Sequence, residues 1–368
     1  MTRLLPLSVD TACVVALIAM SSSFGRSSAG TNSVDPVSSI QCGVSLSGAE
    51  FGTDKVGFSN ETPGIFGRDY TYNTERSVQY FCERGASLLR LPIRWERIQP
   101  RLGEPLDELE LARLRVAIGW ASKHNGRVII DIHNFGRYVL VRNGRPRACA
   151  IDEEVRGENL VTREHFVDLW RRLSLAFRDE PTIYAYGLMN EPHDMGKSNW
   201  KAISQAAVDA IRGGNDFHRI LVAGDGWSKA HRFEEANGSA AWIRDSANNI
   251  AYEAHCYFDR DGSGRYANSY EEESGADADL VGRGERRVQS FAQWCARNGV
   301  RGFVGELAVP AADSRWQPGL ERALAAMKRA GLEGCYWGGG EWWGDHPLSI
   351  QPTAGFRTPS PLMAIFTR

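Results

Sequence analysis

The sequence predicts an α/β fold in which eight parallel strands, each followed by a helix, close into a (β/α)8 TIM barrel. Short apolar runs alternate with helical patterns along most of the chain, which is typical of repeated strand–helix units. Several of these runs are apolar on both faces, as strands buried between helices and a barrel interior are. The length of 368 residues also fits, since one such barrel takes about 250 residues plus insertions.

We expect the eight strands at short apolar runs that end in turn-forming or polar residues. In chain order they are Cys42–Leu46, Leu88–Pro92, Val128–His133, Tyr184–Asn190, Ile220–Ala223, Ile250–His255, Phe303–Glu306 and Cys335–Trp337. The helices expected between them are Thr74–Arg84, Asp107–Asn125, Thr162–Arg178, Asn199–Arg212, a short one near Ser239–Ser246, Gly284–Asn298 and Arg315–Ala330. Four of these helices are followed by a glycine in the C-terminal cap position, namely Gly85, Gly126, Gly299 and Gly331.

The N-terminus has the features of a targeting segment. Arg3 is followed by the apolar run Ala12–Met20 and then by small residues, a pattern that resembles a secretory signal peptide over residues 1–30. The alternatives are an uncleaved anchor, although the apolar run is too short to span a bilayer permanently, and a tolerated disordered tail. Residues 31–39 continue a polar linker, and the barrel is expected over residues 40–368. We therefore expect a secreted or periplasmic protein.

Composition narrows the class of partner. The 43 Lys and Arg residues nearly balance the 45 Asp and Glu residues, so charge gives no reason to expect a nucleic acid or an anionic membrane. Eleven Trp and eleven Tyr suit a carbohydrate ligand, whose apolar faces stack on aromatic rings. Removal of Cys13 with a signal peptide would leave six cysteines and up to three disulfides, with isolated buried thiols as the commoner alternative. No Cys or His metal-ligand spacing is present, so we expect no metal. We also expect no cofactor and a monomer.

Six of the eight predicted strands end in residues that can move protons or stack on a ring. In a (β/α)8 barrel these ends meet at the active site. The residues are Arg90, His133, Asn190 with Glu191, His255 with Tyr257, Glu306 and Trp337. Pro192 ends its strand because it has no N–H for the ladder. Each residue alone could be incidental, but the joint pattern predicts a catalytic site.

Two of these residues, Glu191 and Glu306, form the expected catalytic pair. Their separation fits three strand–helix units, which places them on the fourth and seventh strands and close together across a small barrel mouth. Hydrolysis of a glycosidic bond needs one carboxyl group to protonate the leaving oxygen and another to meet the positive charge on the anomeric carbon. The pair therefore predicts a glycoside hydrolase.

Six motifs in this order resemble glycoside hydrolase family 5, a cellulase family with retaining (β/α)8 barrels. They are Leu-Leu-Arg90-Leu-Pro, Asp-Ile-His133-Asn-Phe, Met-Asn190-Glu191-Pro, Glu-Ala-His255-Cys-Tyr257, Val-Gly-Glu306 and Tyr-Trp337-Gly-Gly-Gly, spread over about Gly43 to Pro352. The segments Gly-Ala-Glu-Phe-Gly and His-Asn-Phe-Gly-Arg-Tyr further resemble its endo-β-1,4-glucanase branch.

The resemblance implies a role for each motif residue. Glu191 would be the acid/base and Glu306 the nucleophile. The positions expected to bind or orient substrate are Arg90, which would hold Glu306 ionised, Asn190, which would bind the 2-hydroxyl, His133, His255, Tyr257, and Trp337, on which a sugar would stack. Sugar subsites are also expected at Trp227, Tyr138 and Trp342, of which at least one should be structural.

Three alternatives remain open from the sequence. The same chemistry could act on another β-glycan, such as mannan or mixed-linkage glucan, or glycosyl transfer could outweigh hydrolysis. A non-catalytic glucan-binding barrel is the third, but a binder needs neither Glu191 nor Glu306. The partner expected for the endoglucanase is a β-glucan polysaccharide or oligosaccharide.

Overall fold

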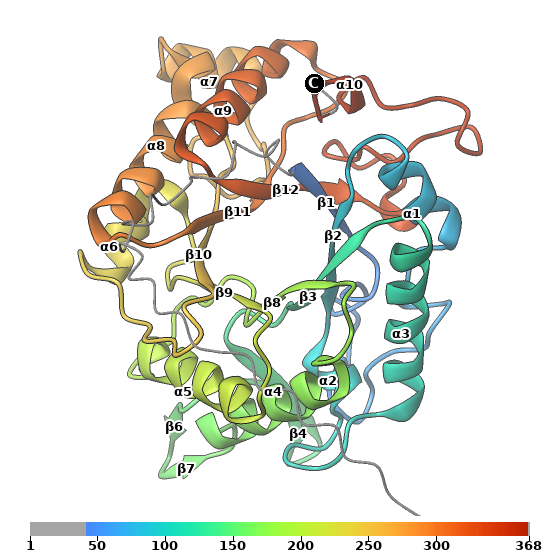
Figure 1. Cartoon of the computed structure of the whole chain (residues 1–368), viewed down its shortest axis with the longest axis vertical. Helices are drawn as coiled ribbons and strands as arrows, with labels where there is room; N and C mark the ends of the chain where they lie inside the picture. The colour runs from blue at the N-terminus through green and yellow to red at the C-terminus, as the bar shows by residue number, and fades with distance from the viewer. Residues whose placement is uncertain (1–41, 367–368) are drawn as a thin grey trace, which may run out of the picture. The chain divides into compact units, whose positions relative to one another are not determined.

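The computed structural model describes residues 42–366, and these form the predicted barrel. Its strands are parallel and close in the order β1-β12-β11-β10-β9-β8-β3-β2, a ring that Figure 1 shows end-on. The strands are β1 (Cys42–Leu46), β2 (Leu88–Ile93), β3 (Arg127–Ile132), β8 (Ile183–Gly187), β9 (Arg219–Ala223), β10 (Ile250–His255), β11 (Gly302–Leu307) and β12 (Glu333–Gly339). The eight predicted strands are therefore confirmed, with ends that differ by up to three residues.

Helices surround the ring of strands (Figure 1). They are α1 (Glu75–Cys82), α2 (Trp95–Ile98), α3 (Glu108–Lys123), α4 (Arg163–Phe177), α5 (Trp200–Gly213), α6 (Phe233–Asn237), α7 (Tyr270–Ala276), α8 (Leu280–Asn298), α9 (Gln317–Ala330) and α10 (Met363–Phe366). The starts of α3, α4 and α5 follow capping chemistry, since Asp107, Thr162 and Asn199 each accept a hydrogen bond from a backbone N–H in the first turn. Gly299 and Gly331 end α8 and α9 in the left-handed conformation, as predicted.

The predicted helix near Ser239–Ser246 is wrong. The Tyr252 hydroxyl accepts hydrogen bonds from Trp242 N–H and Ile243 N–H, so this backbone is satisfied without a helical turn. The segment is irregular, and the short helix α6 precedes it. The acidic stretch after Ser269, which was not among the predicted helices, forms α7, because Ser269 and Glu272 make a capping box.

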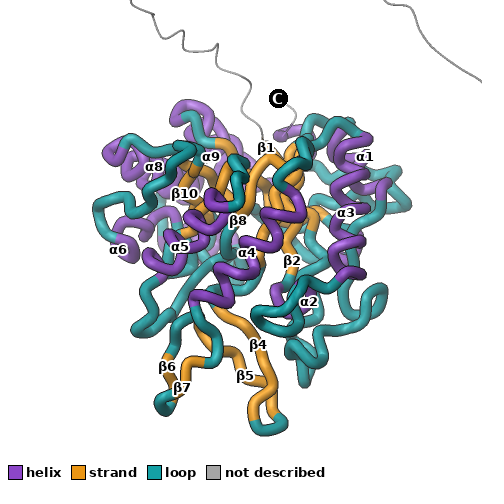
Figure 2. Tube along the Cα trace, turned by 60° about the horizontal axis from the view of Figure 1, so that its bottom comes forward, coloured by secondary structure: helices purple, strands orange, loops and turns teal. Residues whose placement is uncertain are grey.

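Two hairpins are inserted between β3 and α4 and were not predicted. The first pairs β4 (Arg137–Arg142) with β5 (Arg145–Ala150), and the second pairs β6 (Glu154–Val155) with β7 (Glu158–Asn159). Figure 2 shows both hairpins at the same end of the barrel, at the bottom of the view. Because they follow β3, they lie at the carboxyl ends of the barrel strands.

The barrel interior changes from apolar to charged along the strands. Its lower layer is a cluster of buried residues: Leu88, Ile129, Tyr184, Ala185, Leu221, Ala251, Phe303 and Cys335. Side chains on one face of a strand recur every second residue. Two residues beyond Leu88, Ile129 and Ala251, that face carries Arg90, Asp131 and Glu253, all almost fully buried. The apolar cluster thus excludes water from one side of the charged layer, and the other side of that layer faces the carboxyl ends of the strands.

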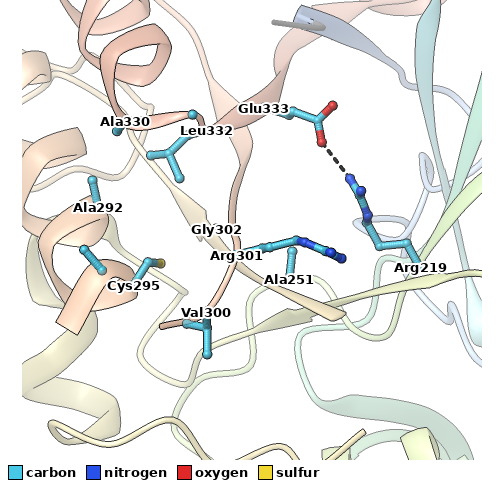
Figure 3. A pocket seen from close by; sticks show the side chains of 12 residues that line it. Arg219, Ala251, Ala292, Cys295, Val300, Arg301, Gly302, Ala330, Leu332 and Glu333 are labelled. Atoms are coloured by element: carbon cyan, nitrogen blue, oxygen red, sulfur yellow. Dashed lines mark hydrogen bonds and ion pairs between the residues drawn. The ribbon is translucent and has the colours of Figure 1, made fainter. Parts of the chain in front are cut away.

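A small pocket of about 280 Å³ lies at the opposite, N-terminal end of the barrel (Figure 3). Arg219 and Glu333, the first residues of β9 and β12, form an ion pair of 2.6 Å between Nη1 and Oε2. The Tyr184 hydroxyl also donates to Glu333. Interactions at this end of a (β/α)8 barrel serve stability rather than catalysis.

The six cysteines of the described chain are all free thiols, so no disulfide joins them. Between residues 42 and 366, no helix is long and apolar enough to cross a membrane. The signal peptide and linker predicted over residues 1–39 lie outside the described residues.

Candidate active site

Two glutamates from separate strands meet at the mouth of the barrel. Glu191 follows β8, and Glu306 is the fifth residue of β11. Oxygen atoms of both carboxyl groups and a nitrogen of His255 all lie within 4.8 Å of one another. Retaining glycosidases hold their two carboxyl groups about 5–5.5 Å apart, whereas inverting ones leave roughly 6.5–9.5 Å for a water. The spacing of Glu191 and Glu306 therefore matches the retaining arrangement.

The backbone at Glu191 is unusual. Its φ angle is +44°, a left-handed conformation that costs energy for a residue with a side chain. Such strain persists only where the surrounding structure fixes it, and the Asn190 N–H donates to Ile132 O on β3 directly before this residue. The bend turns the carboxyl group of Glu191 back toward Glu306 instead of letting the strand continue.

Glu306 is held as a carboxylate. Arg90 Nη1 donates to its Oε1 at 2.9 Å, and the Tyr257 hydroxyl donates to its Oε2 at 2.6 Å. Burial alone would favour the neutral acid, but the positive charges of His255 and Arg90 outweigh it and lower the pKa of Glu306. The Arg90 contact is the one expected of a residue that holds Glu306 ionised.

The pKa of Glu191 is shifted in the opposite direction. Burial raises the pKa of Glu191 above its usual value, and the negative charge of Glu306 adds to this, while the contact with His255 works against it. Two neighbouring carboxyl groups whose pKa values move apart supply one acid and one anion. Glu191 is thus suited to donate a proton while Glu306 stays ionised.

His255 joins the two carboxyl groups. Its Nδ1 lies 2.6 Å from Glu191 Oε1 and 3.3 Å from Glu306 Oε2, and its Nε2 lies 3.4 Å from Glu253 Oε1. Burial works against a charged ring, but the three carboxylates outweigh it and raise the pKa of His255 to about 10. A charged imidazole donates at both nitrogens and accepts at neither. The same three groups, Glu191, His255 and Glu306, could geometrically ligate a metal, but that would first require His255 to lose this proton.

His133 is uncharged by contrast, because burial lowers the pKa of His133 well below its usual value. Its Nδ1 lies 2.9 Å from Asp131 Oδ2, which fixes the proton on that nitrogen, so Nε2 accepts from Asn190 Nδ2 at 3.3 Å. Arg90 Nη2 donates to Asn190 Oδ1 at 2.6 Å. Asn190 is therefore locked in one orientation, with the second hydrogen of Nδ2 left for a ligand. The polar contacts of the His133 ring are thus to Asp131 and Asn190, and through Asn190 it orients the group expected to bind the 2-hydroxyl.

Asp131 and Glu253 are functional residues that the sequence interpretation missed. Each stands two residues before a site histidine on the same strand face, beneath the imidazole it contacts. Glycines on the adjacent strands leave room for them. A Cβ added at Gly305 would lie 1.8 Å from Glu253 Oε1, and one at Gly187 would lie 3.1 Å from Asp131 Oδ1. The repeated carboxylate-x-His pattern in two apolar runs was a signal that could have identified both.

Aromatic rings pack against two histidines, His133 and His193. Trp337 is stacked parallel to His133, with 5.2 Å between ring centroids, and Trp343 meets its edge at 5.8 Å. Elsewhere, Trp227 stacks on His193 at 3.4 Å and lies 6.0 Å from Phe135. Trp227 is 37% exposed, so it remains available to a sugar ring.

Tyr138 and Trp342, two of the three further positions expected at sugar subsites, lie in different environments. Tyr138 is fully buried, its ring packs against Trp95, and its hydroxyl donates to Gln99 O and Pro100 O, so its assignment to a sugar subsite is wrong. It anchors the β4–β5 hairpin instead. Trp342 is 39% exposed in the turn after β12, and its role stays a prediction.

Known proteins share this architecture. The family model described as cellulase, glycosyl hydrolase family 5, matches residues 44–343. Endo-β-1,4-glucanase B of Emericella nidulans is 28% identical over 317 residues, which cover 85% of this chain and 86% of that protein. Among solved structures, an endo-β-1,4-glucanase of Xanthomonas axonopodis pv. citri is 33% identical with a TM-score of 0.75, covering 89% of this chain and 97% of its own. An endoglucanase of Pseudomonas stutzeri, solved in complex with cellobiose, is 31% identical with a TM-score of 0.76, covering 89% and 91%.

Proposed function

The chain belongs to the cellulase family, glycosyl hydrolase family 5, and from this premise we propose that it is a retaining endo-β-1,4-glucanase. The observation that carries the proposal is the pair of carboxyl groups at retaining distance, with the pKa of Glu191 raised and that of Glu306 lowered. Its substrate is a β-1,4-linked glucan, in keeping with the endoglucanases that it resembles.

In the first step, Glu306 attacks the anomeric carbon while Glu191 protonates the glycosidic oxygen. The bond between that carbon and that oxygen breaks, the leaving chain takes the proton of Glu191, and an ester joins Glu306 to the sugar. Tyr257 and Arg90 donate to Glu306 and hold it in place for the attack. The short spacing leaves no room for a water between the two carboxyl groups.

In the second step, Glu191 changes from acid to base. Esterification removes the negative charge of Glu306, which had been raising the pKa of Glu191, so this pKa falls. Glu191 then takes a proton from an incoming water, whose oxygen attacks the anomeric carbon and releases Glu306. Two inversions at one carbon leave its configuration unchanged.

The remaining side chains position the sugar. Asn190 presents its free amide hydrogen where the 2-hydroxyl is expected, a contact that strengthens in the transition state. Trp337, stacked on His133, offers a ring to the sugar before the scissile bond. Trp227 offers a second ring. Its backbone N–H donates to Pro192 O, in the residue after Glu191. Because Glu191 protonates the leaving oxygen, we assign Trp227 to the leaving-group side.

We further propose that the protein is exported, acts as a monomer and needs no metal. Export is supported by the apolar run at 12–20 followed by small residues. N-terminal sequencing of the protein recovered outside the cytoplasm tests this, and a start at Met1 would contradict a cleaved signal. The alternatives of mannan specificity or dominant glycosyl transfer have no observation in their favour.

The proposal is tested by product analysis on hydroxyethyl cellulose, lichenan and glucomannan. We expect a rapid loss of viscosity with few new reducing ends on hydroxyethyl cellulose, since internal bonds are cut. Glu306→Gln should abolish this activity with the melting temperature preserved, while Glu321→Gln, on α9, should keep full activity. Near-normal turnover by Glu306→Gln, or activity on glucomannan alone, would contradict the proposal.

A further inference from the structure

An open pocket of about 760 Å³ lies between the two inserted hairpins. Four of its lining residues are arginines, Arg142, Arg145, Arg147 and Arg156, and no acidic residue lines it. We call it the arginine pocket. The first three come from the β4–β5 hairpin and the fourth from the turn between β6 and β7, two segments that lie together in Figure 2.

Three of these arginines carry unneutralised charge. Arg142 forms an ion pair with Glu158, but Arg145, Arg147 and Arg156 make no side-chain hydrogen bond or ion pair with any residue between 42 and 366. Arg145 and Arg156 are exposed, and Arg147 is partly exposed. Like charges gathered in this way repel each other, so the arrangement is unfavourable without an anionic partner.

Two carboxylates that follow the β4–β5 hairpin in sequence are committed to other groups. Asp152 Oδ2 accepts from Arg163 Nε and Nη2 at 3.1 and 2.9 Å, and Asp152 Oδ1 accepts from the Arg163 backbone N–H. Glu153 accepts from Ala150 N–H at 3.2 Å. Neither is therefore placed to neutralise the arginine pocket. Glu154, on β6, is exposed and is not among the residues that line the pocket, so the charged side chains of the lining are all positive.

The hairpin that carries the pocket is fixed to the barrel. Tyr138 is buried at its base, and Asn60 N–H donates to Val139 O while Val141 N–H donates to Asn60 Oδ1. Arg137, the first residue of β4, donates to His193 O and Asp194 O in the loop that follows Glu191. The hairpin thus starts beside the leaving-group side of the site, where Trp227 and His193 stack.

We propose that the arginine pocket binds carboxylate groups on the substrate, so that the preferred polymer is an acidic β-1,4-glucan, one whose glucan backbone carries carboxylate substituents. Guanidinium groups pair with carboxylates through two parallel hydrogen bonds, whereas a neutral glucan offers no such partner. The pocket would hold the chain on the leaving-group side, beyond the glutamates. The inference rests on the proposed endoglucanase activity and extends it to a substrate class.

The test compares two soluble polymers with the same backbone, anionic carboxymethyl cellulose and neutral hydroxyethyl cellulose. The variant is the triple substitution Arg145→Gln, Arg147→Gln and Arg156→Gln, all at surface positions outside the catalytic machinery. A matched control removes the same charge at the opposite end of the barrel. It combines Arg84→Gln, Arg127→Gln and Arg178→Gln, which lie near the end of α1, at the start of β3 and at the end of α4.

We expect the pocket variant to raise KM on carboxymethyl cellulose about three- to tenfold at low salt, with kcat unchanged, because exposed ion pairs are individually weak but act together here. KM on hydroxyethyl cellulose should not change. The difference should vanish near 1 M NaCl, where the screening length is about 3 Å. The control variant should behave as the unaltered protein does on both polymers.

Equal changes on both polymers, or an equal effect of the control variant, would overturn the inference. It would also be overturned if the pocket variant lost binding to double-stranded DNA while its kinetics on carboxymethyl cellulose stayed the same, since the pocket would then serve nucleic acid. These outcomes are distinct from failure of the proposed function, in which the unaltered protein cleaves neither polymer.

Discussion

Removal of one hydroxyl group, in Tyr257→Phe, tests how the site keeps its nucleophile ionised. The Tyr257 hydroxyl donates to Glu306 Oε2 at 2.6 Å in a buried setting. A hydrogen bond to a charged group contributes about 1.5–3 kcal/mol, and one pKa unit corresponds to about 1.4 kcal/mol. Loss of this bond should therefore raise the pKa of Glu306 by about 1–2 units.

The direction of the effect on activity follows from the charge that Glu306 needs. Glu306 attacks as a carboxylate, and its pKa in the protein lies below its ordinary value, so activity is lost as the pH falls through that pKa. With a higher pKa, the loss should occur at higher pH. We expect the acid limb of kcat/KM against pH to move up by about 1–2 pH units in Tyr257→Phe.

The control is Tyr266→Phe, which makes the same chemical change in the neighbouring loop. The Tyr266 hydroxyl donates to Ala308 O and accepts from Phe258 N–H, and neither contact reaches a catalytic glutamate. Its acid limb should coincide with that of the unaltered protein. An unmoved limb in Tyr257→Phe, or an equal shift in both variants, would refute the reasoning.

Three other substitutions separate the roles assigned to the site. Glu253→Gln should lower the pKa of His255 from about 10 by about 1–3 units, as measured by nitrogen-15 NMR titration of the ring, and an unchanged value would contradict the assigned contact. Glu191→Gln should slow polysaccharide hydrolysis about 10²–10⁴-fold. It should spare glycosyl-enzyme formation from a dinitrophenyl cellobioside, because that leaving group needs no proton. Equal losses in both assays would argue against Glu191 as the general acid. Tyr138→Phe should lower the free energy of unfolding by about 1 kcal/mol in a denaturant titration with KM unchanged, whereas a raised KM would restore it as a subsite residue.

Much of the site was predictable because a parallel barrel turns sequence order into spatial order. Each strand end delivers its residue to the same face, so Glu191 and Glu306 could be paired before any coordinates were considered. Arg90 was also predictable, since a charge within an apolar run is costly unless it has a partner. Its partners are Glu306, Asp131 and Glu253.

What the sequence could not supply depends on contacts between distant segments. Tyr138 resembled a surface aromatic because nothing in the local sequence shows that the β4–β5 hairpin folds over Trp95. The backbone near Trp242 was assigned to a helix because its hydrogen-bond acceptor, the Tyr252 hydroxyl, comes from a strand ten residues further along. Glu253 is an intermediate case, because the Glu-x-His spacing was a usable signal in the sequence, whereas the space it occupies is created by Gly305 on the next strand.

The assignment of Glu306 as nucleophile and Glu191 as acid/base is tested most directly by trapping the covalent intermediate. A 2-deoxy-2-fluoro cellobioside with a good leaving group slows both steps but the second one more, so the glycosyl-enzyme accumulates and can be mapped by peptide mass spectrometry. The account predicts one added sugar on the peptide that contains Glu306. A label on Glu191 or on another residue, or no label from a protein that cleaves β-1,4-glucan with inversion, would contradict it.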